Sequence, residues 1–241
     1  MSPKQTRLQK AQDYLRVHGI SRTIHRCSYS AIKRYYPYMT MNCIWADARK
    51  LNVPNEKLPY EARFLTRGEL LRYAADPANS GAGLTKEVIP VLMDNGDECF
   101  GILDGQKLAA FCWYCVNPPA RINDLWALEF APGCVYVYFV YTDPQYRGKR
   151  LLARGIKLAS REYLKRGYPN LLAFVEWANY SSMTAFLRMG FQQFGRMRMT
   201  RLFGRTIVQG GDGCERFDFR VVQNERPLQP QVASRASQAA D

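Results

Sequence analysis

The sequence predicts an α+β (mixed α/β) domain built around one sheet. Three observations predict this class. Residues 61–133 combine helical patterns with strand-like runs and hairpin turn signals, which favours antiparallel neighbours. A helical pattern then connects two strand-like runs, Cys134–Tyr141 and Asn170–Glu176, as in a βαβ unit whose two strands are parallel. Further strand-like runs follow up to residue 222.

Residues 1–60 are predicted to form an N-terminal extension with helical character. Residues 2–18 have apolar positions at loose helical spacing, and this helix is expected to end before Gly19. Residues 29–38 mix aromatic and basic side chains. Such a mixture either stacks on nucleic acid or packs as a lobe with its cations outward, and the packing lobe is favoured. No strand is predicted in this extension, which is expected to cover or shape a substrate cleft.

A capping box opens the first helix after the extension. Thr66 is followed by Glu69 and then by apolar residues, the arrangement in which both side chains bond to the first turn. Asp104-Gly105 between two strand-like runs predicts a hairpin. The remaining elements expected in this part of the chain are a strand at 62–66, a helix capped by Thr85, hairpin strands at 99–103 and 107–116, and a strand at 124–130.

The stretch after Tyr141 is predicted to bind an anion. A short turn leads into the basic loop 146–150, which contains Gly148, and a helix follows with apolar positions from Leu151 to Leu164. The first turn of a helix has unpaired N–H groups and a partial positive charge, and neighbouring cations increase its attraction for anions. A solvated helix start is the plain alternative.

The last third of the chain is predicted to alternate between strands and one short helix. The elements expected after residue 176 are a helix at 179–189 closed by Gly190, one or two strands over 191–197 and 199–208, a strand at 214–222, and a disordered tail at 223–241.

Composition narrows the class of partner without choosing one. The formal net charge is +13, which attracts a phosphorylated cofactor, nucleic acid or an acidic membrane surface. Seven scattered cysteines suggest reduced thiols and a cytoplasmic protein. Cys112 and Cys115 have metal-type spacing, but an offset of three in a strand points them to opposite faces, so no metal site is expected. No export signal and no apolar run of membrane-spanning length is visible.

Two stretches carry a resemblance to a known family. The first is Val140–Lys149 (VYTDPQYRGK), and the second is Asn179–Phe191 (NYSSMTAFLRMGF). Together, and separated by a helix and a strand, they resemble the GCN5-related N-acetyltransferase (GNAT) superfamily over residues 61–222. The resemblance implies a GNAT-like, mostly antiparallel sheet in which one parallel strand pair splays apart, with helices on both faces.

The same resemblance implies an acyl-CoA co-substrate, acetyl-CoA or a longer acyl-CoA. Backbone amides near Val140 and Thr142 would hold the pantetheine arm and polarise the thioester carbonyl. The remaining positions that correspond to the family's cofactor site are Arg147, Gly148, Lys149, Arg150, Leu151, Leu152, Asn179 and Ser182. Asn179 is also expected to cap its helix.

Three positions depart from the family pattern. Arg150 and Leu152 stand where the family's loop has a glycine and a second small residue, and Leu152 is expected to narrow the pocket unless it points into the core. Phe186 stands where many members place the tyrosine that protonates the leaving thiolate. That proton would come from water, from Tyr180 or from another tyrosine, or the thiolate would leave without help.

In the family an amine attacks the thioester directly, and a carboxylate or a water chain ending in one takes its proton. Glu176, at the end of its strand, is the first candidate for this base, and Glu129 is the second. Tyr136 and Tyr138 share one face of the central strand and either line the acceptor pocket or belong to the core. Cys134 is a poor nucleophile candidate, because its neighbours are apolar and no histidine is near it in the sequence.

Three functions follow, and the first is favoured. The first, which the resemblance implies, is an acyl-CoA-dependent N-acyltransferase whose acceptor is an amine of a small molecule or a protein. It is otherwise a CoA-binding or regulatory protein that kept the fold with weak catalysis, which Phe186, Arg150 and Leu152 would support. The third is a transferase directed to tRNA or another nucleic acid, which the basic surplus supports weakly. A homodimer is compatible with the sequence, which does not reveal the oligomeric state.

Overall fold

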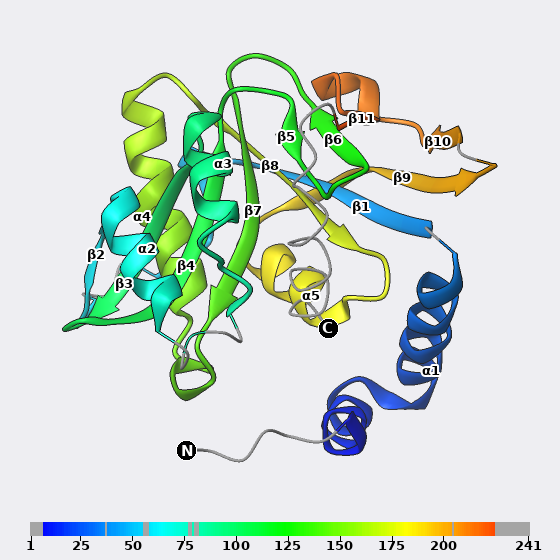
Figure 1. The fold of residues 1–241 in the computed structure, drawn as a ribbon, viewed down its shortest axis with the longest axis horizontal. Coiled ribbons are helices and arrows are strands. Elements are labelled where there is room, and N and C mark those ends of the chain that lie inside the picture. Colours follow the sequence, from blue (N-terminus) through cyan, green and yellow to red (C-terminus); the bar gives the residue numbers. More distant parts are fainter. Residues whose placement is uncertain are drawn as a thin grey trace.

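The computed structural model describes residues 7–36, 38–54, 58–76, 79, 82–203 and 205–224. The predicted disordered tail lies outside the described residues except for its first two positions. The fold is a mixed α+β structure around one large sheet, as predicted (Figure 1). No described helix has the length and apolar character needed to cross a membrane.

Within the described residues the large sheet has eight strands, of which only the β7–β8 neighbours run parallel. In spatial order the strands are β10 (Arg205–Gly210), β9 (Gln192–Leu202), β1 (Tyr38–Asp47), β8 (Asn170–Glu176), β7 (Cys134–Thr142), β4 (Lys107–Cys115), β3 (Glu98–Asp104) and β2 (Glu61–Phe64). A second sheet has the order β11 (Arg220–Gln223), β6 (Trp126–Glu129) and β5 (Ala120–Arg121).

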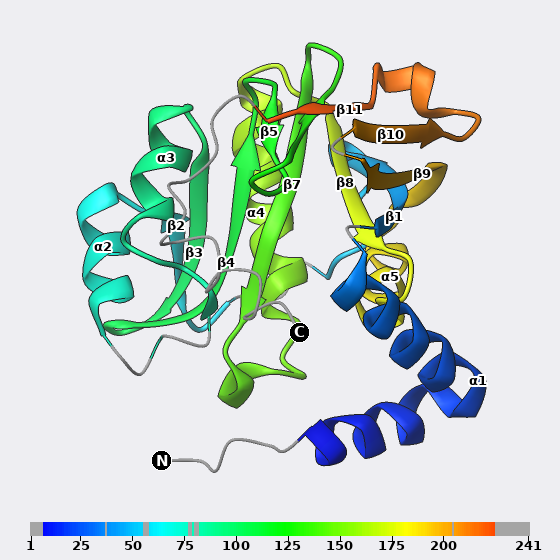
Figure 2. The same ribbon diagram turned by 45° about the vertical axis from the view of Figure 1, so that its right-hand side comes forward.

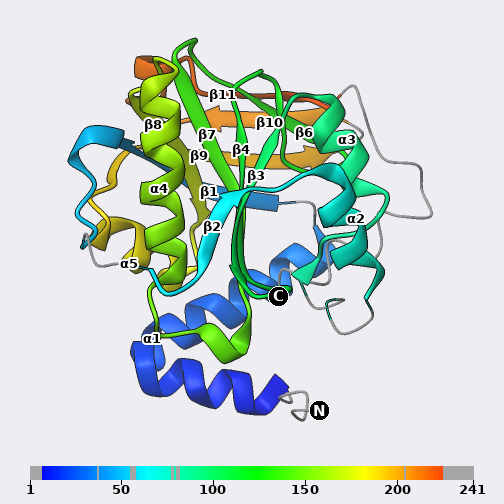
Figure 3. The same ribbon diagram turned by 90° about the vertical axis from the view of Figure 1, so that its left-hand side faces the viewer.

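Helices cover both faces of the large sheet (Figure 3). The helices are α1 (Arg7–Tyr35), α2 (Arg67–Ala75), α3 (Val88–Asp94), α4 (Leu151–Lys165) and α5 (Tyr180–Arg188). Ile156 of α4 and Phe186 of α5 belong to the buried cluster on one face. On the other face, Leu70 of α2 and Ile89 of α3 pack around Trp113, and the second sheet covers a third cluster.

Local sequence patterns fold largely as predicted. The Thr66–Glu69 capping box opens α2, and Asp104 pairs with Lys107 across the β3–β4 hairpin. The helix α1 has non-helical backbone angles at Gly19, where the sequence predicted an end, but it continues beyond this kink to Tyr35. The predicted strand at 214–222 is wrong in its first half, because Cys214–Phe217 forms a 3-10 helix and Asp218 takes a left-handed conformation before β11 begins.

The strand β1 corrects the prediction for residues 1–60. No strand was expected there, yet β1 lies between β8 and β9 and is paired on both sides. Residues 40–43 (TMNC) alternate polar and apolar side chains, a strand pattern that the sequence reasoning overlooked. Thr40 to Ile44 are all buried in the sheet, including the polar Thr40 and Asn42. A boundary at residue 60 therefore does not separate the large sheet from the part of the chain before it.

Candidate active site

The two parallel strands, β7 and β8, diverge after a short paired stretch. β7 and β8 pair at three positions, the last being Tyr136 with Leu172. Beyond that point β8 stays paired with β1 as far as Glu176, and β7 stays paired with β4 as far as Thr142 (Figure 1). The β7 edge that faces β8 therefore carries backbone N–H and C=O groups without a strand partner, and such groups require other hydrogen-bond partners.

An irregularity in β7 lies at the place where the strands diverge. The β4–β7 register shifts between Phe111 and Trp113, and Phe139 has a φ of 43°. A bulge of this kind bends its strand and increases its twist. It therefore turns β7 away from β8 just before Val140 and Thr142, the positions whose amides were predicted to face the pantetheine arm.

The loop between β7 and α4 exposes its cations. Arg147, Lys149 and Arg150 are all exposed, and Gly148 has a φ of 82°. Tyr146 anchors the loop, since its hydroxyl donates to Asp104 Oδ2 over 2.7 Å, and this bond raises the pKa of Tyr146 to about 12. The three cations therefore lie on a short loop that the hydrogen bond between Tyr146 and Asp104 holds in place.

The start of α4 leaves its first-turn amides uncapped. Its N-cap residue, Arg150, makes no side-chain cap hydrogen bond, and the first turn contains no acidic residue. Uncapped N–H groups and the helix dipole favour an anion at this position.

Arg150 holds a backbone conformation suited to glycine. Its φ of 56° and ψ of 27° are left-handed, which costs a residue with a Cβ atom about 1–2 kcal/mol. Arg150 thus occupies the family's glycine position with a glycine-like backbone. Leu151 is buried in one cluster with Tyr146, and Leu152 packs against the main core cluster. Leu152 therefore has the core-facing orientation in which it was not expected to narrow a cofactor pocket.

The start of α5 contains the second stretch of the resemblance. Asn179 Oδ1 accepts a hydrogen bond from the Ser182 amide over 3.1 Å, which confirms Asn179 as the helix cap. The Tyr180 hydroxyl lies 2.8 Å from His25 Nδ1 of α1. Their role toward a cofactor stays a prediction.

The two candidates for the base lie apart, and each carboxylate forms an ion pair with a cationic side chain. Glu176 Oε1 is 2.5 Å from Lys33 Nζ of α1, and both side chains are about one third exposed. Glu129 Oε2 is 2.5 Å from Arg220 Nε in the second sheet. Of the two, only Glu176 ends a strand of the diverging pair, and the role of either as a base stays a prediction.

The helix α1 contacts several of the candidate site residues, and the residues of α1 that make these contacts were not predicted from the sequence. Besides Lys33 and His25, Tyr14 donates to the Ala178 carbonyl and His18 Nε2 lies 2.8 Å from Ser181 Oγ. The His25 ring meets the Trp177 ring edge-on at 4.1 Å. The helical spacing of residues 14, 18, 25, 29 and 33 could have marked one docking face, but nothing local could have indicated its target.

An aromatic row crosses the base of the diverging strands. The ring of Tyr136 stacks on that of Tyr138 at 5.4 Å and lies 6.1 Å from that of Phe174. Tyr136 is buried, so its core interpretation is supported. The Tyr138 hydroxyl donates to Asp97 Oδ2. Asp97 is buried, and this burial raises the pKa of its carboxyl. Sequence reasoning did not single out Asp97, which no local motif marks.

Phe186 belongs to the core rather than to the site surface. It is buried, and its ring meets that of Phe191 edge-on at 4.9 Å. Phe186→Tyr is expected to lower the free energy of unfolding by about 1–3 kcal/mol, because the new hydroxyl would be buried among apolar side chains. Urea denaturation measures this, and Phe203→Tyr at a fully exposed position is the control. An unchanged stability would mean that the hydroxyl reaches a polar partner or solvent.

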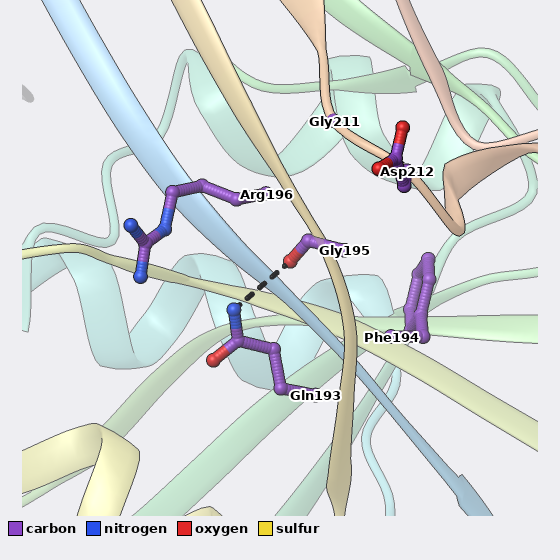
Figure 4. Close-up of a pocket in the computed structure, with 6 residues that line it drawn as sticks. All are labelled: Gln193, Phe194, Gly195, Arg196, Gly211 and Asp212. Carbon is purple, nitrogen blue, oxygen red and sulfur yellow. Dashed lines mark hydrogen bonds between the residues drawn. The ribbon is translucent and has the colours of Figure 1, made fainter.

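The surface also has a hollow of about 390 Å³ at a distance from these residues (Figure 4). It is lined by Gln193, Phe194, Gly195, Arg196, Gly211 and Asp212. Gln193 spans it with a 3.3 Å hydrogen bond to the Gly195 carbonyl. Since β1 separates β9 from β8, the hollow lies two strands away from the diverging pair and contains none of the predicted site residues.

The structure also bears on the predictions for the Cys134 thiol and for metal binding. Cys134 is buried, and this burial raises the pKa of its thiol to about 11, so the thiol stays protonated near neutral pH. Within the part of the chain that the structure describes, no cluster of three or more His, Cys, Asp or Glu side chains is placed to hold a metal ion.

Comparison with known proteins gives similarities at three levels. Residues 62–191 match the family model described as acetyltransferase (GNAT) family. Mycothiol acetyltransferases of Rhodococcus jostii (strain RHA1) and Rhodococcus opacus (strain B4) are 38% and 36% identical over 96 residues, which is 39% of this chain. The alignment spans only 28% of the length of each of these relatives.

Solved structures with a similar fold are more distant in sequence. A GCN5-related N-acetyltransferase from Sphaerobacter thermophilus has a TM-score of 0.45 at 13% identity, covering 77% of this chain and 57% of its own. One from Kribbella flavida has a TM-score of 0.42 at 15% identity, covering 80% and 66%. Similarity at such sequence identities and TM-scores supports no inference about the substrate.

Proposed function

Because the chain belongs to the acetyltransferase (GNAT) family, we propose that it moves an acetyl or longer acyl group from acyl-CoA to an amine. The observation that carries the proposal is the divergence of β7 and β8 beside the uncapped, cation-rich start of α4. In acyl-CoA a pyrophosphate is joined to a pantetheine arm that ends in the thioester. The start of α4 suits the pyrophosphate, and the gap between β7 and β8 suits the arm.

The proposed cofactor contacts are mostly backbone groups. The free edge of β7 at Val140 and Thr142 would bond the amide-rich pantetheine arm as a neighbouring strand does. The amides of the first turn of α4 would bond the pyrophosphate, with Arg147, Lys149 and Arg150 supplying charge.

In the proposed reaction the amine nitrogen attacks the thioester carbonyl carbon. A C–N bond forms and the C–S bond breaks, so the amine loses a proton and the thiolate gains one. We assign the first proton to Glu176. Its Oε1 is held by Lys33, which leaves Oε2 for the amine. Tyr180 would donate the second proton, with His25 beside its hydroxyl.

The acceptor class follows from chemistry rather than from the relatives. The curated relatives are named for mycothiol, and the alignment spans a minor part of their length. For this chain we propose an amine on a small molecule or a protein.

Two measurements on the full chain test the proposal. Calorimetry should detect acetyl-CoA binding, and a thiol-reactive dye should detect CoA release when a panel of amines is added. Binding with amine-dependent release supports the transferase. Binding without release from any amine would instead identify a CoA-binding protein, and absence of both would contradict the proposal.

Neutralising the loop should weaken cofactor binding. The double change Arg147→Ala with Arg150→Ala is expected to raise the Kd for acetyl-CoA by about 10²–10⁴-fold, because charged hydrogen bonds to phosphate contribute about 1.5–3 kcal/mol each and two are removed. Calorimetry measures it. Lys165→Ala, an exposed cation at the other end of α4, is the matched control and should leave Kd unchanged. Equal effects of both variants would mean that only overall charge matters.

A further inference from the structure

The second half of α1 has two different faces. His25, Tyr29 and Lys33 face the domain, where they contact Tyr180, the Thr40 amide and Glu176. The opposite face carries a stripe of apolar and small side chains that are all exposed. The outer stripe consists of Ile20, Ile24, Cys27, Ala31 and Tyr35.

The outer stripe is long and well exposed. Ile20 is 69% exposed, Ile24 60% and Tyr35 76%. Steps of four, three, four and four residues place all five side chains on one side of a helix. Single exposed apolar residues are ordinary, but a continuous stripe marks a surface that another body covers. The fold already uses the other face of α1, so the stripe does not serve the domain itself.

The charge around the outer stripe has one sign. Between residues 14 and 46 the chain has five cations and no acidic residue. Three of the cations contact other side chains, Arg22 with Tyr180, Arg26 with Tyr14 and Lys33 with Glu176. Arg16 and Arg34 are exposed. Two copies of α1 facing each other would bring like charges together without a carboxylate to balance them. An anionic partner relieves this repulsion.

A second exposed apolar element lies on the same side of the molecule. The β9–β10 hairpin exposes Leu202, Phe203, Ile207 and Val208, and Phe203 is fully exposed with a φ of 48°. Exposed arginines, among them Arg201 and Arg205, flank Phe203. Figures 1 and 2 show the hairpin and α1 projecting from one side in both views. Neither element touches the hollow of Figure 4 through these side chains.

We propose that the outer stripe of α1 and the tip of the β9–β10 hairpin bind the surface of an anionic lipid bilayer. Apolar side chains enter the boundary between headgroups and acyl chains, and arginines bind the anionic headgroups. Nucleic acid would bind the cations but leave the apolar stripe in water. The inner face of α1 holds Glu176 and Tyr180, so the proposed active site lies about one helix diameter, ~10–12 Å, from the bilayer.

Vesicle co-sedimentation tests the proposal independently of catalysis. The full chain is mixed with vesicles of phosphatidylcholine alone or of phosphatidylcholine with 30% phosphatidylglycerol, on the order of the anionic content that attracts basic segments. We expect at least about tenfold stronger binding to the anionic vesicles, falling as salt is raised. Ile20→Glu with Ile24→Glu should weaken binding at least about tenfold, and Phe203→Glu severalfold, because each places a carboxylate in the interface.

Leu187→Glu is the matched control, since Leu187 is exposed on α5 outside the stripe and the hairpin. It should bind as the unchanged chain does. All substituted positions are exposed, and thermal unfolding verifies that each variant is folded.

Four outcomes would overturn the proposal. These are no binding to anionic vesicles, equal binding to both vesicle types, unchanged binding of the Ile20/Ile24 variant, and loss of binding in the Leu187 control. Two parallel measurements test the other two possible partners of this surface, a nucleic acid and a second copy of the chain. Tight tRNA binding that the Ile20/Ile24 variant loses would assign the surface to nucleic acid. Concentration-dependent dimers that this variant abolishes, measured by light scattering, would assign it to a second copy.

Discussion

Glu176→Gln is expected to lower kcat/KM for acetyl transfer by about 10²–10⁴-fold, the usual contribution of a general base. The amide keeps the shape of the carboxyl and a partner for Lys33, but it cannot take the proton of the attacking amine. Steady-state kinetics with the best amine of the panel measures the loss. Calorimetry should show the affinity for acetyl-CoA unchanged, because Glu176 lies at the end of β8 and not on the loop proposed to hold the pyrophosphate.

Glu129→Gln is the matched control for this prediction. Glu129 has the same chemistry and also pairs with a cation, but it belongs to the second sheet. Its replacement should change kcat/KM by less than about threefold, because the substitution alters neither a buried side chain nor a group that reacts. A large loss with Glu129→Gln and none with Glu176→Gln would reverse the order of the two candidates. Full activity of both variants would mean that another group takes the proton.

Gly213→Ala should cause the largest loss of stability among conservative changes near the second sheet, about 3 kcal/mol. Gly213 has a φ of +95°, and a Cβ atom there would lie 1.9 Å from the Phe194 carbonyl oxygen. Left-handed backbone costs a residue with a Cβ about 1–2 kcal/mol, and the overlap forces a backbone shift that costs about 1–3 kcal/mol more. Thermal unfolding should show Tm lower by about 6–12 °C.

This loss should extend to the site, because Gly213 leads into the buried Cys214 and Phe217. These side chains share a core cluster with Tyr136 and Leu172, the last paired positions of β7 and β8. The control is Gly210→Ala, where an added Cβ meets nothing within 4 Å and φ is not positive. It should stay within about 0.5 kcal/mol of the unchanged chain. Equal stability of the two variants would show that the 211–214 segment relaxes without cost.

The sequence by itself predicted the elements whose causes lie within a few residues. The capping box at Thr66, the turn at Asp104-Gly105, the helix cap at Asn179 and the βαβ unit around α4 all formed. Each depends on backbone preferences or on side chains that reach the adjacent turn, so a local pattern is enough to specify it. The basic loop before α4 was also predicted from the sequence, because its residues are adjacent in the chain.

The tertiary structure alone decided how distant segments meet. It inserted β1 between β8 and β9 and buried both faces of that strand, including the polar side chains of Thr40 and Asn42. It also brought Lys33 to Glu176 across 143 positions of the chain, and His25 to Tyr180 across 155. Such contacts depend on which faces pack together once the sheet has assembled, and no short-range pattern records that choice. The docking of α1, which covers the candidate site and exposes the outer stripe, therefore follows from packing rather than from local sequence.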